Sequence, residues 1–180
     1  HAAIDFSPAD EAAVVSRIAC RRCGICAAEC PADAISFARA PRHATRAELA
    51  DPAPVTVFAC ENSAHEAAVE LGRAWRPYSD RVRILSVPCA GQVDARDILH
   101  ALERGAERVW VLSCIKPSCK YLDGPARAAR RVSRVRELLD AAGLDADRVR
   151  WGSLISGETD RLLRYIDPSS APAGGAEAWT

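Results

Sequence analysis

The chain has 180 residues, with 24 Lys and Arg balanced by 24 Asp and Glu, so no strong field draws it to nucleic acid or to a membrane surface. Its hydrophobic content of 49% is ordinary for a globular protein, and no apolar run approaches the roughly 18 residues that span a bilayer. Residues 1–19 lack the apolar core of a signal peptide, and eight clustered cysteines are typical of metal ligands or catalytic thiols in a reducing, cytoplasmic compartment. The chain opens on His1 and contains no Met, so we expect it to be a piece of a longer protein.

Four cysteines near the N-terminus form the first motif with recognisable chemistry. They read Cys20-x2-Cys23-x2-Cys26-x3-Cys30-Pro31, the spacing with which bacterial ferredoxins hold a [4Fe–4S] cluster. In two-cluster ferredoxins the fourth cysteine of such a run ligates the other cluster. We therefore predict Cys20, Cys23 and Cys26 as ligands of one cluster. Cys30 either closes the same cluster or serves a second one, whose other ligands lie upstream.

Short apolar runs at residues 13–15 and 34–37 flank the cysteines. This layout predicts a strand, a cluster loop and a strand, which is half a ferredoxin, over residues 1–40. Such a unit buries little core of its own and depends on its cluster and neighbours for stability. The Pro-containing stretch 41–54 is then expected to be a linker.

From residue 55 the pattern changes to apolar strands alternating with amphipathic helices. Strands are predicted at 55–59, 82–87, 109–112 and 149–155, and helices at 63–75, 94–102, 125–142 and 159–166, with Gly105 and Gly143 ending two of them. Such alternation predicts an α/β domain over residues 55–167, with a four-stranded parallel sheet and flanking helices, flavodoxin- or Rossmann-like. Residues 168–180 are predicted to be a disordered tail.

The predicted sheet has cysteines at its strand ends. Neither a Gly-x-Gly-x-x-Gly nor a P-loop motif is present. Instead, Cys60 follows the first strand, Cys89 the second and Cys114 the third, and Cys119 lies in the same loop as Cys114. Because the carboxyl ends of parallel strands lie at one edge, the four thiols should converge there. Four converging thiolates suit a [2Fe–2S] cluster or a zinc ion.

Three alternatives stay open at this point. The four cysteines could be buried apolar residues without a ligand. They could hold zinc in an interaction domain beside a ferredoxin module, although none shows the short Cys-x2-Cys spacing of a zinc ribbon. Cys60, just before a predicted helix start, could instead be the reactive thiol of a redox enzyme, although no His follows at a spacing that suggests a base.

The remaining chemically notable residues are assigned structural roles. Asp94 is predicted to cap a helix, and Gly91, Gly105 and Gly124 to form turns. His43, His65 and His100 are isolated and expected to be structural or at the surface. The basic residues on and near the long helix form either a solvated face or a docking surface for an acidic partner; they are Lys116, Lys120, Arg127, Arg130, Arg131 and Arg134.

Residues 55–167 resemble the delta, or iron–sulfur, subunit of methyl-viologen-reducing, F420-non-reducing hydrogenase. The resemblance rests on four segments: Phe58-Ala-Cys60-Glu-Asn-Ser63, Val87-Pro-Cys89-Ala-Gly91-Gln-Val93-Asp94, residues 105–114 ending in Leu-Ser-Cys114, and Cys119-Lys-Tyr121-Leu-Asp-Gly124. The family often has a further cysteine three positions after the first, where this chain has Ser63.

This resemblance implies an electron-transfer component rather than a stand-alone catalyst. The domain would hold a [2Fe–2S] cluster, with Cys60, Cys89, Cys114 and Cys119 as its candidate ligands. It would pass electrons between a hydrogenase or formate dehydrogenase and the flavin subunit of a heterodisulfide reductase. The family also includes fusions of this domain to ferredoxin motifs at the C-terminal end of such a flavin subunit. The expected cofactors are thus a [4Fe–4S] and a [2Fe–2S] cluster.

Overall fold

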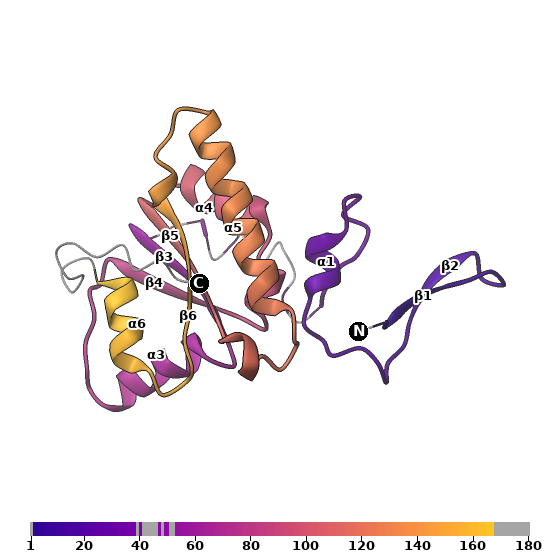
Figure 1. Ribbon diagram of the computed structural model, residues 1–180, viewed down its shortest axis with the longest axis horizontal. Helices are drawn as coiled ribbons and strands as arrows, with labels where there is room; N and C mark the ends of the chain where they lie inside the picture. The colour runs from indigo at the N-terminus through magenta and orange to yellow at the C-terminus, as the bar shows by residue number, and fades with distance from the viewer. Residues whose placement is uncertain (1, 39, 41–46, 48, 51–52, 168–180) are drawn as a thin grey trace.

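The computed structural model describes residues 2–38, 40, 47, 49–50 and 53–167 (Figure 1). The predicted tail, residues 168–180, and much of the predicted linker, residues 41–54, lie outside the described residues. The described residues form an α/β domain and a smaller N-terminal segment that projects beside it (Figure 1).

The α/β domain is built on a parallel sheet in the order β4-β3-β5-β6. The strands are β3 (Val55–Cys60), β4 (Val82–Val87), β5 (Arg108–Ser113) and β6 (Val149–Ser153). This confirms the predicted α/β class, the four strands and their parallel direction. In sheets of this order the direction of winding reverses between the first and third strands, here β3 and β5, and ligands bind beyond the strand ends at that point.

Helices cover both faces of the sheet. The helices α4 (Ala95–Glu103) and α5 (Gly124–Ala141) pack on one face, and α3 (Ala64–Arg73) and α6 (Thr159–Ile166) on the other (Figure 1). β3 is buried along its whole length, with Phe58 in the first core and Val57 in the second, since successive strand residues point to opposite faces. Among the described helices, none has both the length and the apolar character needed to cross a bilayer.

Short 3-10 turns lie in three loops, two of them after β4 and β5 at the carboxyl edge of the sheet and one before β6 at the opposite edge. They are η1 (Ala90–Gln92), η2 (Lys116–Ser118) and η3 (Ala146–Arg148). Asp94 caps α4 with a reciprocal capping box to Asp97, which confirms its predicted role. Gly105, with a φ of 114°, follows α4 in the left-handed conformation expected of a helix-ending glycine.

The N-terminal segment differs from the predicted half-ferredoxin in its strands. It contains a hairpin of β1 (Ile4–Ser7) and β2 (Ala12–Val15), followed by the short helix α1 (Ile25–Glu29). The strand at 12–15 is therefore present, but the strand predicted at 34–37 is wrong, because those residues are irregular. β2 pairs instead with β1, a partner only a few residues away in the chain, whose approach costs little loop-closure entropy.

Candidate metal centres

Four buried cysteines meet at the carboxyl edge of the sheet, as the topology predicted. Cys60 is the last residue of β3, Cys89 follows β4, and Cys114 comes directly after β5. Cys119 ends η2 in the next turn of the chain. Their exposed fractions run from 1% for Cys60 to 6% for Cys119, so all four thiols are withdrawn from solvent. We name this group the sheet-edge site.

Two of the four thiols of the sheet-edge site are in contact, and the other two lie beside one glycine. The Sγ atoms of Cys60 and Cys114 are 3.4 Å apart. Two sulfurs that share one tetrahedral metal with bonds of about 2.3 Å would lie about 3.8 Å apart, so this pair fits a common metal atom. The sulfurs of Cys89 and Cys119 both border the space where a Cβ of Gly124 would lie. Among the described residues, no three His, Cys, Asp or Glu side chains surround a single point as ligands of one ion do.

Two glycines allow this packing: Gly91 lies in a turn, as predicted, but the assignment of Gly124 to a turn was wrong. Gly124 is the first residue of α5, where a Cβ would lie 2.7 Å from the sulfur of Cys89 and 3.3 Å from that of Cys119. Gly91 lies in η1, where a Cβ would be 2.9 Å from the Cα of Gly124. The absence of side chains at both positions brings the loop after β4 against the start of α5.

Backbone N–H groups and neighbouring thiols control the charge of the sheet-edge site. The hydrogen bond with Cys114 lowers the pKa of Cys60 to about 6, with help from the N–H groups of Asn62 and Ala90. The same bond raises the pKa of Cys114, because one proton serves both sulfurs. Burial raises the pKa of Cys89 to about 12, although the N–H of Gly91 acts to lower it. The site thus withholds water and supplies oriented donors, which is how proteins tune thiolate-bound clusters.

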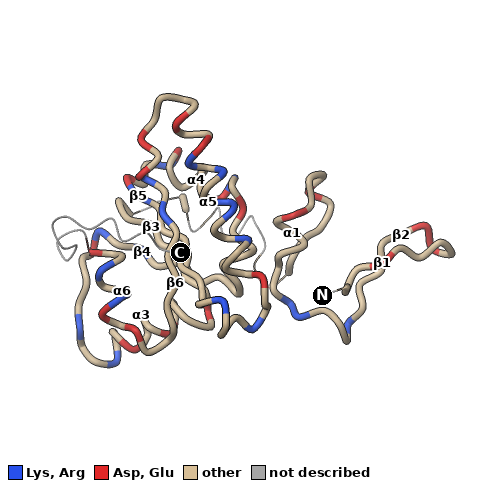
Figure 2. The backbone as a smooth tube through the Cα atoms, viewed as in Figure 1, with Lys and Arg blue, Asp and Glu red and all other residues tan. Residues whose placement is uncertain are grey.

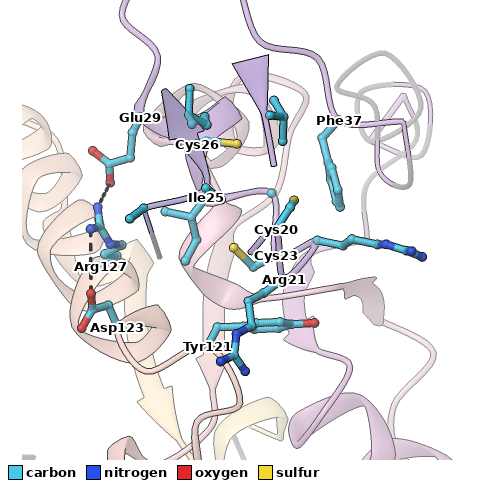
Figure 3. A pocket seen from close by; sticks show the side chains of 16 residues that line it. Cys20, Arg21, Cys23, Ile25, Cys26, Glu29, Phe37, Tyr121, Asp123 and Arg127 are labelled. Atoms are coloured by element: carbon cyan, nitrogen blue, oxygen red, sulfur yellow. Dashed lines mark hydrogen bonds and ion pairs between the residues drawn. The ribbon is translucent and has the colours of Figure 1, made fainter. Parts of the chain in front are cut away.

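A second group of cysteines lines a cavity of about 370 Å³ between the N-terminal segment and the start of α5 (Figure 3). Cys20, Cys23 and Cys26 line it, together with the rings of Phe37 and Tyr121. Burial raises the pKa of Cys26, and the charges of Cys23 and Cys20 add to the effect, which indicates that the three thiols act on one another. We name this group the N-terminal site.

Cys30 lies outside the lining of that cavity. Its sulfur accepts a hydrogen bond from the backbone N–H of Ala34 at 3.3 Å. That N–H, aided by those of residues 32, 33 and 35, lowers the pKa of the Cys30 thiol. The structure therefore brings together three of the four cysteines in the N-terminal run and surrounds the fourth with its own set of donors.

The two sites adjoin each other across α1 and η1. Cys23 is 7% exposed and belongs to the same apolar core as Cys89, and its charge raises the pKa of Cys89. Ile25, at the start of α1, packs on η1, since a Cβ at Gly91 would lie 3.2 Å from its Cδ1. Between the two groups of thiols there is consequently packed protein rather than solvent.

Glu29, at the end of α1, fixes the N-terminal segment to α5. Its Oε1 accepts hydrogen bonds from Arg131 at 2.5 Å and from Arg127 at 3.0 Å. Arg131 also donates to the backbone carbonyls of Gly91 and Val93. Burial acts to raise the pKa of Glu29, but the two guanidinium groups outweigh it and lower the pKa. The sequence did not identify Glu29; the Arg127 and Arg131 pair, one helical turn apart, was the available signal.

Some of the basic residues of α5 are thus already paired with acidic residues of the same chain. Arg127 and Arg131 bind Glu29, and Arg134 pairs with Glu137 at 3.0 Å. Figure 2 shows acidic residues interspersed with basic ones along the chain.

The Nδ1 atom of His100 lies 3.4 Å from Oε2 of Glu103. His43 lies outside the described residues.

Comparison with known proteins identifies the family of the α/β domain. Residues 55–170 match the family described as methyl-viologen-reducing hydrogenase, delta subunit. The vhu iron-sulfur subunit of the F420-non-reducing hydrogenase of Methanopyrus kandleri is 34% identical over 118 residues, which cover 66% of this chain and 89% of that protein. The protein of the same name from Methanocaldococcus jannaschii is 31% identical over 117 residues, covering 65% of this chain and 87% of the relative.

A second kind of relative is much longer. It is a subunit of the ferredoxin:CoB-CoM heterodisulfide reductase of Methanosarcina mazei, 30% identical over 106 residues, which are 58% of this chain and 13% of that protein. The family match covers β3 to α6, including all four cysteines of the sheet-edge site. The chain belongs to the family of the delta subunit of methyl-viologen-reducing hydrogenase.

Proposed function

We propose that the protein is an electron-transfer component of a hydrogenase or heterodisulfide reductase type of complex, with a [2Fe–2S] cluster in the sheet-edge site. The observation that supports this most is the meeting of four buried thiols, with Cys60 and Cys114 in contact and Cys89 and Cys119 both beside Gly124. Two pairs of thiolates suit a cluster with two metal atoms, each of which needs two protein ligands. The names of the hydrogenase relatives, which describe them as iron-sulfur subunits, agree with this chemistry.

We further propose that Cys20, Cys23 and Cys26 hold a [4Fe–4S] cluster. Their shared cavity and the spacing of the run both support this. Cys30, apart from the cavity and with its own N–H donors, is assigned to a further cluster whose other ligands come from outside the described residues. Of the two roles that the sequence left open for Cys30, the geometry favours this one.

When bound, the clusters supply one-electron chemistry, and the chain's own residues hold and insulate them. The thiolates bind iron, burial excludes water, and the N–H groups of Asn62, Ala90 and Gly91 stabilise negative charge on the sulfurs. The adjoining positions of Cys23 and Cys89 provide a short route between the two sites. The proposed role requires no acid, base or nucleophile.

For partners, we propose a hydrogenase- or formate dehydrogenase-type donor and a heterodisulfide reductase-like flavoprotein, in the cytoplasm. Relatives named as components of a hydrogenase and of a heterodisulfide reductase support this pair of partners. The thiol-enzyme alternative has less support, because Cys60 is only 1% exposed and its sulfur contacts another cysteine. Metal analysis distinguishes zinc in the sheet-edge site from the proposed [2Fe–2S] cluster.

The experiment is to measure iron, zinc and acid-labile sulfide in the anaerobically purified protein, together with its visible absorption. About six irons per chain are expected for the two clusters, whereas one zinc with about four irons would refute the [2Fe–2S] assignment. Electron paramagnetic resonance of the reduced Cys89→Ser variant should then lack only the [2Fe–2S] signal. If the [4Fe–4S] signal disappears instead, the proposed division of ligands is wrong.

A further inference from the structure

Ser63 occupies the N-cap position of α3 without capping the helix. A serine at this position usually accepts a hydrogen bond through its hydroxyl from an N–H of the first turn. Here the backbone carbonyl of Ser63 accepts from the N–H of Ala67 at 2.9 Å, but the hydroxyl makes no cap bond. The side chain is therefore directed away from the helix that it begins.

The hydroxyl of Ser63 is buried and makes no hydrogen bond within the described residues. The residue is 1% exposed, and its Oγ has no donor or acceptor partner there. A buried hydroxyl without a partner costs free energy, so such an atom points to a ligand that completes it. The N–H of Ser63 donates to the carbonyl of Cys60 at 3.1 Å, which holds the residue beside the sheet-edge site.

The hydroxyl lies beside the first pair of thiols. Its geometry falls short of a hydrogen bond to either sulfur, but it lies close enough to those of Cys60 and Cys114 to favour negative charge on each. Cys60 and Cys114 are themselves 3.4 Å apart, so Ser63 sits next to the place where their common metal atom would lie. Its unused donor thus faces sulfur.

We propose that the Ser63 hydroxyl donates a hydrogen bond to a sulfur of the [2Fe–2S] cluster at the Cys60–Cys114 pair and so raises its reduction potential. This inference rests on the proposed function of the sheet-edge site. Reduction adds one electron and increases the negative charge on the sulfurs, so a donor stabilises the reduced form more than the oxidised form. No bond to sulfur forms or breaks, and the proton stays on Ser63 Oγ.

The test is the midpoint potential of the cluster, measured by redox titration with electron paramagnetic resonance, in the wild type and in Ser63→Ala. We expect the alanine variant to lower the equilibrium constant for reduction about tenfold, which is a shift of about 59 mV to more negative potential for one electron. Ser63→Thr keeps the hydroxyl and should restore the wild-type potential. Ser63→Cys keeps the side-chain size with a weaker donor and should give an intermediate value.

Ser113→Ala is the matched control. Ser113 is also 1% exposed and adjoins Cys114, but its hydroxyl already donates to the carbonyl of Cys114 at 3.1 Å and accepts from Trp151 Nε1 at 3.2 Å. Its removal should lower the thermal midpoint while leaving the potential in place. Equal shifts in Ser63→Ala and Ser113→Ala, or no shift in Ser63→Ala and Ser63→Cys, would overturn the inference.

The result expected if the proposed function is wrong differs from the result expected if only the role of Ser63 is wrong. If the proposed function is wrong, the wild type itself gives no [2Fe–2S] signal, whatever residue stands at position 63. An unchanged potential in Ser63→Ala with a normal wild-type signal refutes only the role of Ser63.

Discussion

Arg131 of α5 and Glu29 of α1 form an ion pair with 2.5 Å between nitrogen and oxygen. The same guanidinium donates to the carbonyls of Gly91 and Val93, which follow Cys89 in the chain. A single side chain therefore joins the N-terminal site to the loop of the sheet-edge site. The side chain of Arg131 is 14% exposed, so this contact is better shielded from solvent than the other ion pairs of α5.

The first prediction concerns this contact. Glu29→Ala removes the acceptor shared by Arg127 and Arg131, so the N-terminal segment should be held less firmly. We expect slower electron transfer between the two clusters and faster proteolysis of residues 2–38, with little change in the unfolding of the α/β domain. Freeze-quench electron paramagnetic resonance and limited proteolysis measure the two effects.

Glu137→Ala is the control for that variant. It removes the partner of Arg134, an exposed pair within α5 that is worth at most about 1 kcal/mol. Transfer rates and proteolysis should stay at wild-type values. If Glu29→Ala behaves in the same way, the contact does not position the two sites.

The second prediction concerns Gly124. In Gly124→Ala the added methyl would lie 2.7 Å from the sulfur of Cys89, so the Cys89 and Cys119 thiols cannot keep their positions. We expect loss of the [2Fe–2S] signal and about two irons, with retention of the [4Fe–4S] signal. Gly72→Ala is the matched control, since a Cβ there meets nothing within 4 Å and a helical alanine stabilises by up to about 1 kcal/mol. Normal iron content in Gly124→Ala would contradict the packing described here.

The third prediction concerns Cys30. Because its sulfur lies outside the cavity of the N-terminal site, Cys30→Ser should leave the cluster proposed for Cys20, Cys23 and Cys26 in place. Iron analysis and the [4Fe–4S] signal of the isolated chain should match the wild type. A loss of about four irons would show instead that Cys30 closes the same cluster.

The fourth prediction concerns pH and the ion pair of Arg136 with Asp147, which ties α5 to η3 at 3.0 Å. The hydrogen bond from Arg136 lowers the pKa of Asp147 below its unfolded value. The pair therefore stabilises the fold above the unfolded pKa, and this contribution is lost as the pH falls through the folded pKa. Asp147→Asn should cost less than about 1 kcal/mol at pH 7, and nothing at a pH below the folded pKa. Urea unfolding at both pH values tests this; an equal difference at both would exclude the pair as its cause.

The α/β domain was predictable because its signals are local. Apolar runs such as Val82–Val87 and the helix cap at Asp94 read directly from the sequence, and strand ends in a parallel sheet share an edge whatever the loops do. The edge position of Cys60, Cys89 and Cys114 followed from topology alone.

What the sequence missed depends on contacts between distant segments. Gly124 has the appearance of a turn residue until Cys89 and Cys119 are placed beside it. Glu29 and Arg131 are 102 positions apart, and no periodicity relates them. Residues 34–37 have the composition of a strand, but the hairpin had already supplied β2 with a partner in β1.

Helix α5 begins at Gly124, against two thiols of the sheet-edge site, and reaches Arg131 seven residues later. With a rise of 1.5 Å per residue, that interval is a rigid length of about 10 Å. The contact that holds the N-terminal segment on α5 thus depends on two turns of one helix, which keep Arg131 at a fixed distance from Gly124 and the sheet-edge site. An insertion or deletion within these two turns would turn Arg131 away from Glu29 and so remove that contact.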